Sequence, residues 1–253
     1  MSWFAERSVQ EDDERAGTEI AEGALVERRE VLSISLGALA ALSLGWPQRA
    51  LAEEPAAPAA DADAGELAWE TLLQKTLPLA EQLVKSKKPN EDAYLFQLMS
   101  FITRLNKAPD AEFKNVAVAS AQTYRKMPLV VVQFRLQPGA AIPYHDHRDY
   151  IGILSSVSGE ARVRSFQIAG ADARPPKGKT FEIRETQDGL LFPGRASVLS
   201  RSRDNIHAVR AGKDGARLLD FFTFFNPAGQ SVFLDVAEKP RDPEKRIFEA
   251  TWK

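Results

Sequence analysis

All three histidines of this 253-residue chain stand where their side chains could bind one metal ion together. His145 and His147 are two residues apart, and His207 lies alone further along the chain. Residues i and i+2 of a β-strand point to the same face of a sheet, so the first two imidazoles would project together. A third imidazole on a neighbouring strand would complete a three-nitrogen site that leaves coordination positions open. The spacing therefore predicts a metal site.

The segments around the histidines have the pattern of β-strands. An apolar run at 129–136 precedes the turn dipeptide Pro138-Gly139, and residues 142–147 form the next predicted strand. From residue 122 onward short apolar segments alternate with turn residues, and the remaining predicted strands are 150–155, 161–168, 179–184, 190–192, 196–199, 205–211, 216–225 and 231–236. Many short strands at this spacing indicate an all-β sandwich or barrel.

Two amphipathic helices are predicted in front of the β-domain. Apolar residues recur at helical spacing from Trp69 to Val84, and a second helical pattern runs from near Asn90 and stops before Pro109. We expect both helices to pack on the outside of the β-domain. In the charged tail at 239–253, Phe248 and Trp252 would hold the chain against the barrel.

The composition is that of an ordinary globular protein, with 44% hydrophobic and 27% charged residues. The formal net charge of -2 gives no global electrostatic reason to expect nucleic acid. The chain has no cysteine, which excludes disulfides, zinc–thiolate sites, iron–sulfur clusters and a cysteine nucleophile. Redox compartment therefore stays undetermined by cysteine usage.

The first 52 residues have the features of an export signal with a long acidic leading part. Arg28-Arg29 precede a short apolar segment at 31–46, and Ala50-Leu51-Ala52 has the A-x-A form of a cleavage site. The run at 27–32 resembles a twin-arginine signal. We expect an exported, periplasmic protein cleaved after residue 52, with an Ala/Pro linker at 53–65, a domain at 66–253 and no membrane span in the mature chain. An uncleaved anchor or a buried helix is the alternative.

The histidine motifs resemble those of cupins. The first cupin motif, G-x5-H-x-H with a later glycine, matches at Gly139, His145, His147 and Gly159. The second motif matches at Gly189, Pro193, Gly194 and His207. The commonest cupins carry a glutamate ligand where this chain has Gly152, and no carboxylate lies in 150–158. The resemblance implies a double-stranded β-helix, or jelly-roll, barrel, so the predicted fold is a cupin barrel preceded by the two N-terminal α-helices.

A more specific resemblance is to the cysteamine dioxygenase and plant cysteine oxidase family of thiol dioxygenases. The run at 142–147 is Ile-Pro-Tyr-His-Asp-His, residues 205–207 are Asn-Ile-His, and Leu219-Asp220 follows. The likeness extends from about Glu91 to Trp252. It implies that His145, His147 and His207 hold Fe(2+). It also implies that the protein adds both atoms of O2 to a small thiol, either a cysteamine- or cysteine-like molecule or an N-terminal Cys, to give a sulfinate.

The charge of such a site agrees with that resemblance. Three neutral imidazoles leave the full charge of a divalent ion uncompensated and three coordination positions free, which suits a thiolate together with O2. Three-histidine sites also hold zinc, where they activate water. The alternative without a metal is three satisfied core histidines.

Several other side chains are candidates for supporting roles. Asp220 lies in an apolar strand, so its carboxylate needs a partner: a ligand imidazole N–H, or a salt bridge to Arg217 or another arginine at the end of the barrel. Asp146 points away from the histidine pair and is expected to be structural. Further pocket candidates, weaker than these, are Tyr150, Tyr144, Arg135 and Arg203.

We therefore expect a monomeric iron dioxygenase whose partners are a small-molecule thiol and O2, with no nucleic acid. The rivals are another three-histidine cupin enzyme, either a non-thiol dioxygenase or a hydrolase, and a non-catalytic periplasmic cupin that binds a metal or small ligand. The sequence leaves the identity of the thiol open.

Overall fold

A computed structural model of the chain describes residues 65–170, 175–201 and 203–253. The predicted export signal, and the predicted linker except for its last residue, lie outside the described residues. Within the described ranges, neither helix combines the length and the apolar character that a membrane crossing requires.

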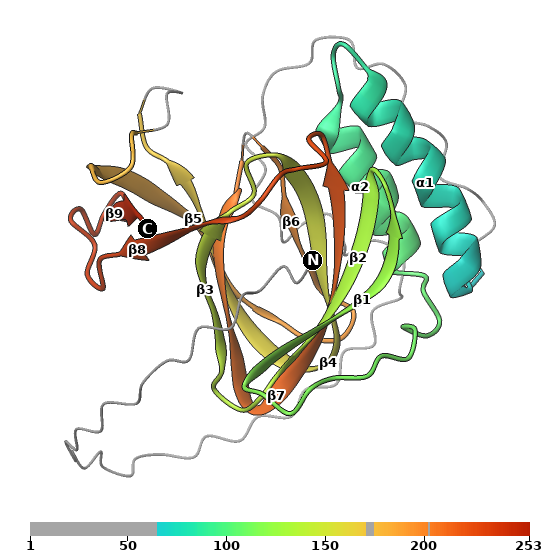
Figure 1. The fold of residues 1–253 in the computed structure, drawn as a ribbon. Coiled ribbons are helices and arrows are strands. Elements are labelled where there is room, and N and C mark those ends of the chain that lie inside the picture. Colours follow the sequence, from blue (N-terminus) through green and yellow to red (C-terminus); the bar gives the residue numbers. More distant parts are fainter. Residues whose placement is uncertain (1–64, 171–174, 202) are drawn as a thin grey trace, which may run out of the picture. The chain divides into compact units, whose positions relative to one another are not determined.

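The described strands form one antiparallel sheet that closes into a barrel. Their order is β1-β2-β7-β3-β8-β9-β5-β4-β6, and an additional pairing of β7 with β4 closes the sheet on itself (Figure 1). The strands are β1 (Val118–Lys126), β2 (Leu129–Leu136), β3 (Ala141–Asp146), β4 (Tyr150–Ile168), β5 (Thr180–Leu191), β6 (Ala196–Leu199), β7 (Ile206–Phe224), β8 (Val232–Val236) and β9 (Ile247–Trp252). The predicted all-β barrel is thus confirmed.

The strands β4 and β7 are each continuous, although the sequence predicted each of them as two. They bend together at Gly159 and Gly215, whose φ angles are 70° and 78°. A Cβ on Gly159 would lie 2.2 Å from the carbonyl oxygen of Gly215, so only glycine permits this approach. The glycines that suggested ends of strands therefore mark corners of the barrel. On the edge of β7 that does not face β4, the neighbouring strand changes at the corner. The first half of β7 pairs with β3, and the second half pairs with β2. The predicted halves of β5 are likewise one strand.

The sequence missed two strands, β1 and β9. β1 is an edge strand whose residues are mostly part-buried or exposed, so it lacks a clean alternation of apolar and polar residues. β9 does alternate, but it is short and lies in a charged tail between β8 and β5. The predicted contact of the C-terminal tail with the barrel is confirmed. The Trp252 ring stacks on Phe181 at a centroid distance of 4.8 Å, and its indole N–H donates to the Pro175 carbonyl at 3.0 Å.

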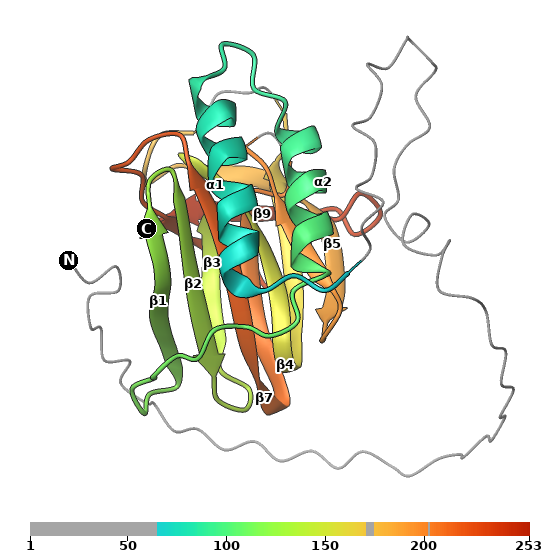
Figure 2. The ribbon, with the colours of Figure 1, turned by 90° about the vertical axis from the view of Figure 1, so that its right-hand side faces the viewer.

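Both predicted helices are present and cover the outer face of the sheet. They are α1 (Trp69–Lys85) and α2 (Glu91–Ile102), and Figure 2 shows them side by side over the strands. α2 begins where the Asn90 side chain accepts a hydrogen bond from the Ala93 N–H, and it ends earlier than predicted. The sheet residues beneath the helices are Leu129, Val131, Ile151, Ile153, Leu219 and Phe221. Packing of these apolar faces fixes which faces of β4 and β7 look outward, and hence which residues point into the barrel.

Candidate metal centre

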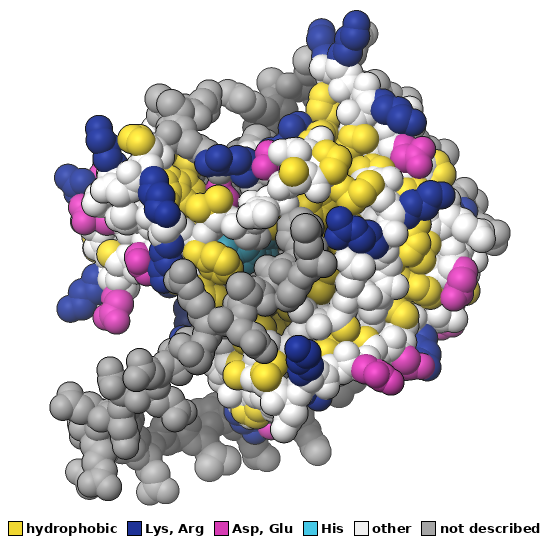
Figure 3. All heavy atoms as spheres, viewed as in Figure 1, with side chains coloured by type: hydrophobic (Ala, Val, Ile, Leu, Met, Phe, Trp, Pro, Cys, Tyr) yellow, Lys and Arg dark blue, Asp and Glu magenta, His cyan; other side chains and the backbone are white. Residues whose placement is uncertain are grey.

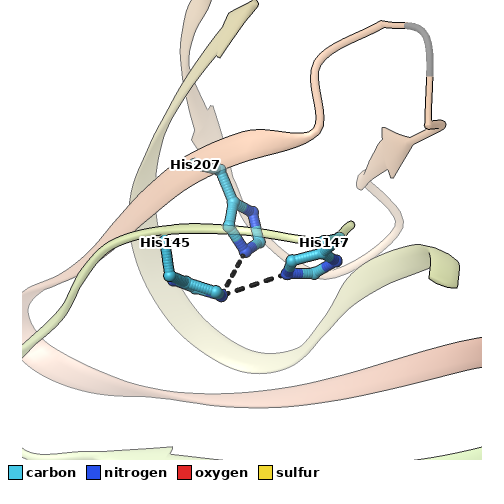
Figure 4. A group of neighbouring side chains, drawn as sticks. All are labelled: His145, His147 and His207. Carbon is cyan, nitrogen blue, oxygen red and sulfur yellow. Dashed lines mark hydrogen bonds between the residues drawn. The ribbon is translucent and has the colours of Figure 1, made fainter. Parts of the chain in front are cut away.

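The barrel brings the three histidines together from two neighbouring strands. His145 lies on β3 and pairs directly with His207 on β7, while His147 follows the end of β3. Val209 is on the same side of β7 as His207 and belongs to the apolar cluster inside the barrel. Strand alternation therefore turns the imidazoles inward, as the spacing predicted, and Figure 4 shows the rings converging.

The ring nitrogens converge through their Nε2 atoms. The Nε2 atom of His145 lies 3.0 Å from Nε2 of His147 and 3.1 Å from Nε2 of His207. One nitrogen from each residue lies within 4.8 Å of the others, and all three side chains are buried. Three nitrogens at these separations can coordinate one cation together.

A backbone carbonyl fixes the tautomer of His145. Its Nδ1 lies 2.8 Å from the carbonyl oxygen of Pro143. Because a carbonyl only accepts hydrogen bonds, Nδ1 carries the proton and the Nε2 lone pair faces the other two rings. The Nδ1 atoms of His147 and His207 are buried and make no hydrogen bond within the described part of the chain.

The environment keeps the three imidazoles uncharged. Burial lowers the pKa of His145 from 6.5 to about 4, although its bond to Pro143 opposes the shift. Burial, together with repulsion from the neighbouring imidazoles, lowers the pKa of His147 well below the ordinary value, and burial and His145 do the same for His207. Neutral imidazoles are the form that binds metals, so the site is ready to coordinate at neutral pH.

The carboxylate ligand of the commonest cupins has no room in this barrel. A Cβ on Gly152 would lie 2.7 Å from the carbonyl oxygen of Phe221, closer than real contacts allow. The donor set that fits the site is therefore three neutral nitrogens with open positions. Both ferrous iron and zinc accept such a set.

Asp220 lies inside the barrel near Gly152. Its side chain is buried, and its Oδ1 lies 3.5 Å from where a Cβ of Gly152 would stand. Oδ1 has no hydrogen-bond partner among the described residues, and burial raises the pKa of this carboxyl well above its usual value. The two partners expected for Asp220 are not seen at this oxygen. Arg217 instead donates to Gln133 and to the Pro109 carbonyl.

Tyr150 adjoins the histidines, as the sequence suggested. Its ring centroid lies 4.5 Å from that of His147 and 5.3 Å from that of Phe222. The phenol hydroxyl forms a hydrogen bond with Ser231, and burial raises the pKa of the phenol above its usual value. The neutral phenol is thus part of the wall beside His147.

The other pocket candidates are engaged elsewhere. Tyr144 accepts a hydrogen bond from Arg164 and packs against Phe166, on the outer side of the sheet. Arg135 donates to the Lys114 carbonyl, and Arg203 forms ion pairs with Asp92 and Asp204. Asp146 accepts from the Val232 N–H, which joins β3 to β8 and agrees with the expected structural role.

The sequence analysis missed two aromatic neighbours of the site. Phe222 and Phe233 each lie 5.8 Å, centroid to centroid, from a ligand candidate: Phe222 from His147 and Phe233 from His145. Phe222 could have been found because it is two residues from Asp220 on one strand. Phe233 could not, because it depends on the pairing of β8 with β3. Figure 3 shows a few histidine atoms in a gap beside hydrophobic side chains on this face, although all three side chains are buried.

Comparison with known proteins agrees with the motifs. A family model described as PCO_ADO matches residues 83–224. Over 128 residues the chain is 30% identical to the 2-aminoethanethiol dioxygenase of Mus musculus, covering 44% of this chain and 44% of the mouse protein. The chain thus spans less than half the length of that curated relative.

Two solved structures are among those to which this chain is similar. KdgF from Halomonas sp. has a TM-score of 0.33 and 18% identity, with 44% of this chain and 84% of that chain covered. The Cnp3 cupin domain of Schizosaccharomyces pombe has a TM-score of 0.34 and 12% identity, with 46% of this chain and 70% of that chain covered.

Proposed function

This chain belongs to the PCO_ADO family, and on that premise we propose that it is a non-haem iron dioxygenase that converts a small thiol to its sulfinate. The same membership and the strand pairing bear out the predicted cupin barrel with two N-terminal helices. The observation that carries the proposal is the convergence of three buried, neutral imidazoles inside the barrel.

His145, His147 and His207 would hold the iron, and the donor set fits that ion. When bound, a ferrous ion of this kind supplies a Lewis-acidic centre that lowers the pKa of a thiol and activates O2. In the proposed reaction two S–O bonds form, both atoms of O2 end on sulfur, the sulfur loses four electrons that reduce O2, and the thiol proton is released.

The residues around the site support an anionic sulfur substrate. Gly152 brings no carboxylate to the site, and Asp220 is held toward its neutral form by burial. Tyr150, Phe222 and Phe233 give the site apolar walls, which limit water and strengthen electrostatic attraction between a thiolate and a cation.

The substrate class proposed is a cysteamine- or cysteine-like thiol or an N-terminal Cys. The printed name of the mouse relative is that of a dioxygenase of 2-aminoethanethiol, and this supports testing that thiol first. The two arginine candidates for a substrate carboxylate are held elsewhere, Arg135 on the Lys114 carbonyl and Arg203 on Asp92 and Asp204.

The test uses the full-length chain loaded with iron under anaerobic conditions. Cysteamine, cysteine, 3-mercaptopropionate and a Cys-initiated peptide are each added with ¹⁸O-labelled O2. We expect O2 uptake with at least one thiol, and a product that gains two labelled oxygen atoms. Zinc-loaded protein is the control and should consume no O2. Iron-replete protein that is inactive with all four thiols would overturn the function and leave the fold unaffected.

A further inference from the structure

The three imidazoles need different hydrogen-bond partners on the sides of the rings that face away from the site. An imidazole that offers its Nε2 lone pair to a cation carries its proton on Nδ1, and that N–H requires an acceptor. The Pro143 carbonyl fills this role for His145 at 2.8 Å. The Nδ1 atom of His207 is buried and has no acceptor among the described residues, and Figure 4 shows this nitrogen pointing away from the other rings.

A serine hydroxyl lies on the strand next to His207. Ser165 of β4 is the direct partner of His207 in the pairing of β4 with β7. Direct partners in antiparallel strands project to the same face, with Cβ atoms about 4.5–5.5 Å apart. Val163 and Val209, each two residues away, both belong to the cluster inside the barrel, which places Ser165 and His207 on that inner face.

The Ser165 hydroxyl is as isolated as the His207 nitrogen. The side chain has 0% exposure, and its Oγ has no hydrogen-bond partner in the described ranges. A buried hydroxyl without a partner is unfavourable, and so is a buried N–H without an acceptor. A rotation of the serine side chain would satisfy both groups at once.

We propose that Ser165 is a positioning residue that accepts a hydrogen bond from the Nδ1–H of His207. The bond would hold the tautomer that directs Nε2 at the cation and would fix the plane of the ring. The inference rests on the proposed metal-binding function. Asp220 is not suited to this role, because it pairs with Leu154 on the far side of the β4 bend from Ser165.

The test compares two buried serines. Ser197 on β6 also has a buried Oγ without a partner among the described residues, but it lies opposite Leu154 and not opposite a histidine. The affinities of the full-length chain for Zn(2+) and Co(2+) are measured by competition with a chelator. We expect Ser165→Ala to bind each metal roughly 10–100-fold more weakly, and Ser197→Ala to bind like the wild type.

Nuclear magnetic resonance of the ring nitrogens gives a second readout, the first part of which needs only the wild type. The chain has three histidines, so ¹⁵N-histidine labelling gives three sets of ring signals. In zinc-loaded wild type the His207 Nδ1–H should exchange slowly with water, and this signal should broaden or disappear in Ser165→Ala.

The outcomes separate the two proposals. If Ser165→Ala binds zinc as tightly as Ser197→Ala and keeps the slow Nδ1–H signal, the positioning role is wrong, whatever the activity with thiols. If the wild type binds no metal, the proposed metal site is wrong. If metal binding depends on Ser165 but no thiol is oxidised, only the proposed dioxygenase function is wrong.

Discussion

At the scale of single residues, burial decides what the histidines can do. The interior keeps their pKa values below the ordinary value for histidine, so their lone pairs remain available in neutral solution. Nε2 of His145 lies within hydrogen-bond distance of Nε2 of both other histidines. A bound cation would give all three nitrogens a common partner. The same burial raises the pKa of Asp220 and favours its protonated form. Burial thus lowers the pKa of the histidines and raises that of the aspartate, because it disfavours the charged form of each.

Removing any ligand histidine should abolish tight metal binding. The wild type is expected to bind one divalent ion per chain, and His145→Ala, His147→Ala and His207→Ala should each lower the occupancy sharply, because two imidazoles do not complete the site. Metal content by mass spectrometry checks this. Full occupancy in all three single variants would show that the ion binds elsewhere.

Asp220 is expected to act on the site through a ligand imidazole. His147 is the candidate, because its Nδ1 has no acceptor in the described chain and Phe222, two residues from Asp220, lies beside its ring. Asp220→Asn should reduce metal affinity or activity roughly 10–100-fold. The free energy of unfolding of the metal-free protein should not fall, because a buried carboxyl is removed. Unchanged affinity and rate would make Asp220 merely structural.

At the scale of elements, the barrel depends on two bends that carry strands from one side to the other. Gly159 on β4 and Gly215 on β7 meet at the corner, and the halves of β7 on either side of the bend carry His207 and Asp220. The bend therefore sets how the first half of β7 lies against β3, and with it the approach of His207 to His145.

Replacing Gly159 should be far more damaging than replacing a glycine with the same backbone angle. Gly139 has φ 71° and Gly159 has φ 70°, but an added Cβ meets nothing within 4 Å at Gly139 and a carbonyl oxygen at 2.2 Å at Gly159. Gly139→Ala should lower the free energy of unfolding by about 1–2 kcal/mol from the backbone angle alone. Gly159→Ala should lower the free energy of unfolding by clearly more than this, as measured by chemical denaturation, or should fail to fold. Equal decreases in the two variants would mean that the backbone at the corner moves to accommodate the added Cβ.

At the scale of the whole molecule, the buried histidines link stability to pH. Their pKa values are lower in the folded protein than the value of about 6.5 in the unfolded chain. At these three residues the unfolded chain therefore binds more protons in this window, and acid destabilises the fold. The raised pKa of buried Asp220 acts in the opposite direction, but it is one group against three imidazoles. The stabilising contribution is present above pH 6.5 and is lost as the pH falls, for His145 down to its pKa of about 4.

The pH dependence can be measured without a metal. The free energy of unfolding of chelator-treated protein should fall between pH 6.5 and pH 4, and the fall should be smaller in His147→Gln, which has one buried imidazole fewer. Bound metal should be released over the same range, because protons compete for the ring nitrogens. A stability that does not change from pH 6.5 to 4 in the wild type would contradict the assigned burial.

We also propose that the chain is exported, on the basis of Arg28-Arg29, the apolar segment after them and Ala50-Leu51-Ala52. Mass spectrometry of the native protein should find a mature chain beginning at Glu53. Replacing both arginines by lysine should leave precursor in the cytoplasm. An uncleaved cytoplasmic chain in wild-type cells would reject the proposal.

The sequence by itself picked out the three histidines that converge in the barrel and the kinds of element that carry them. Strand alternation put His145 and His147 on one face, and helical periodicity placed two helices outside the barrel, because both patterns depend only on near neighbours in the chain. Pairing between distant strands could not be obtained in this way. The closed sheet alone set His145 and Ser165 on either side of His207, turned Gly159 and Gly215 into corners, and brought Phe233 to the site. Register and strand bending are decided by long-range packing, which no local spacing encodes.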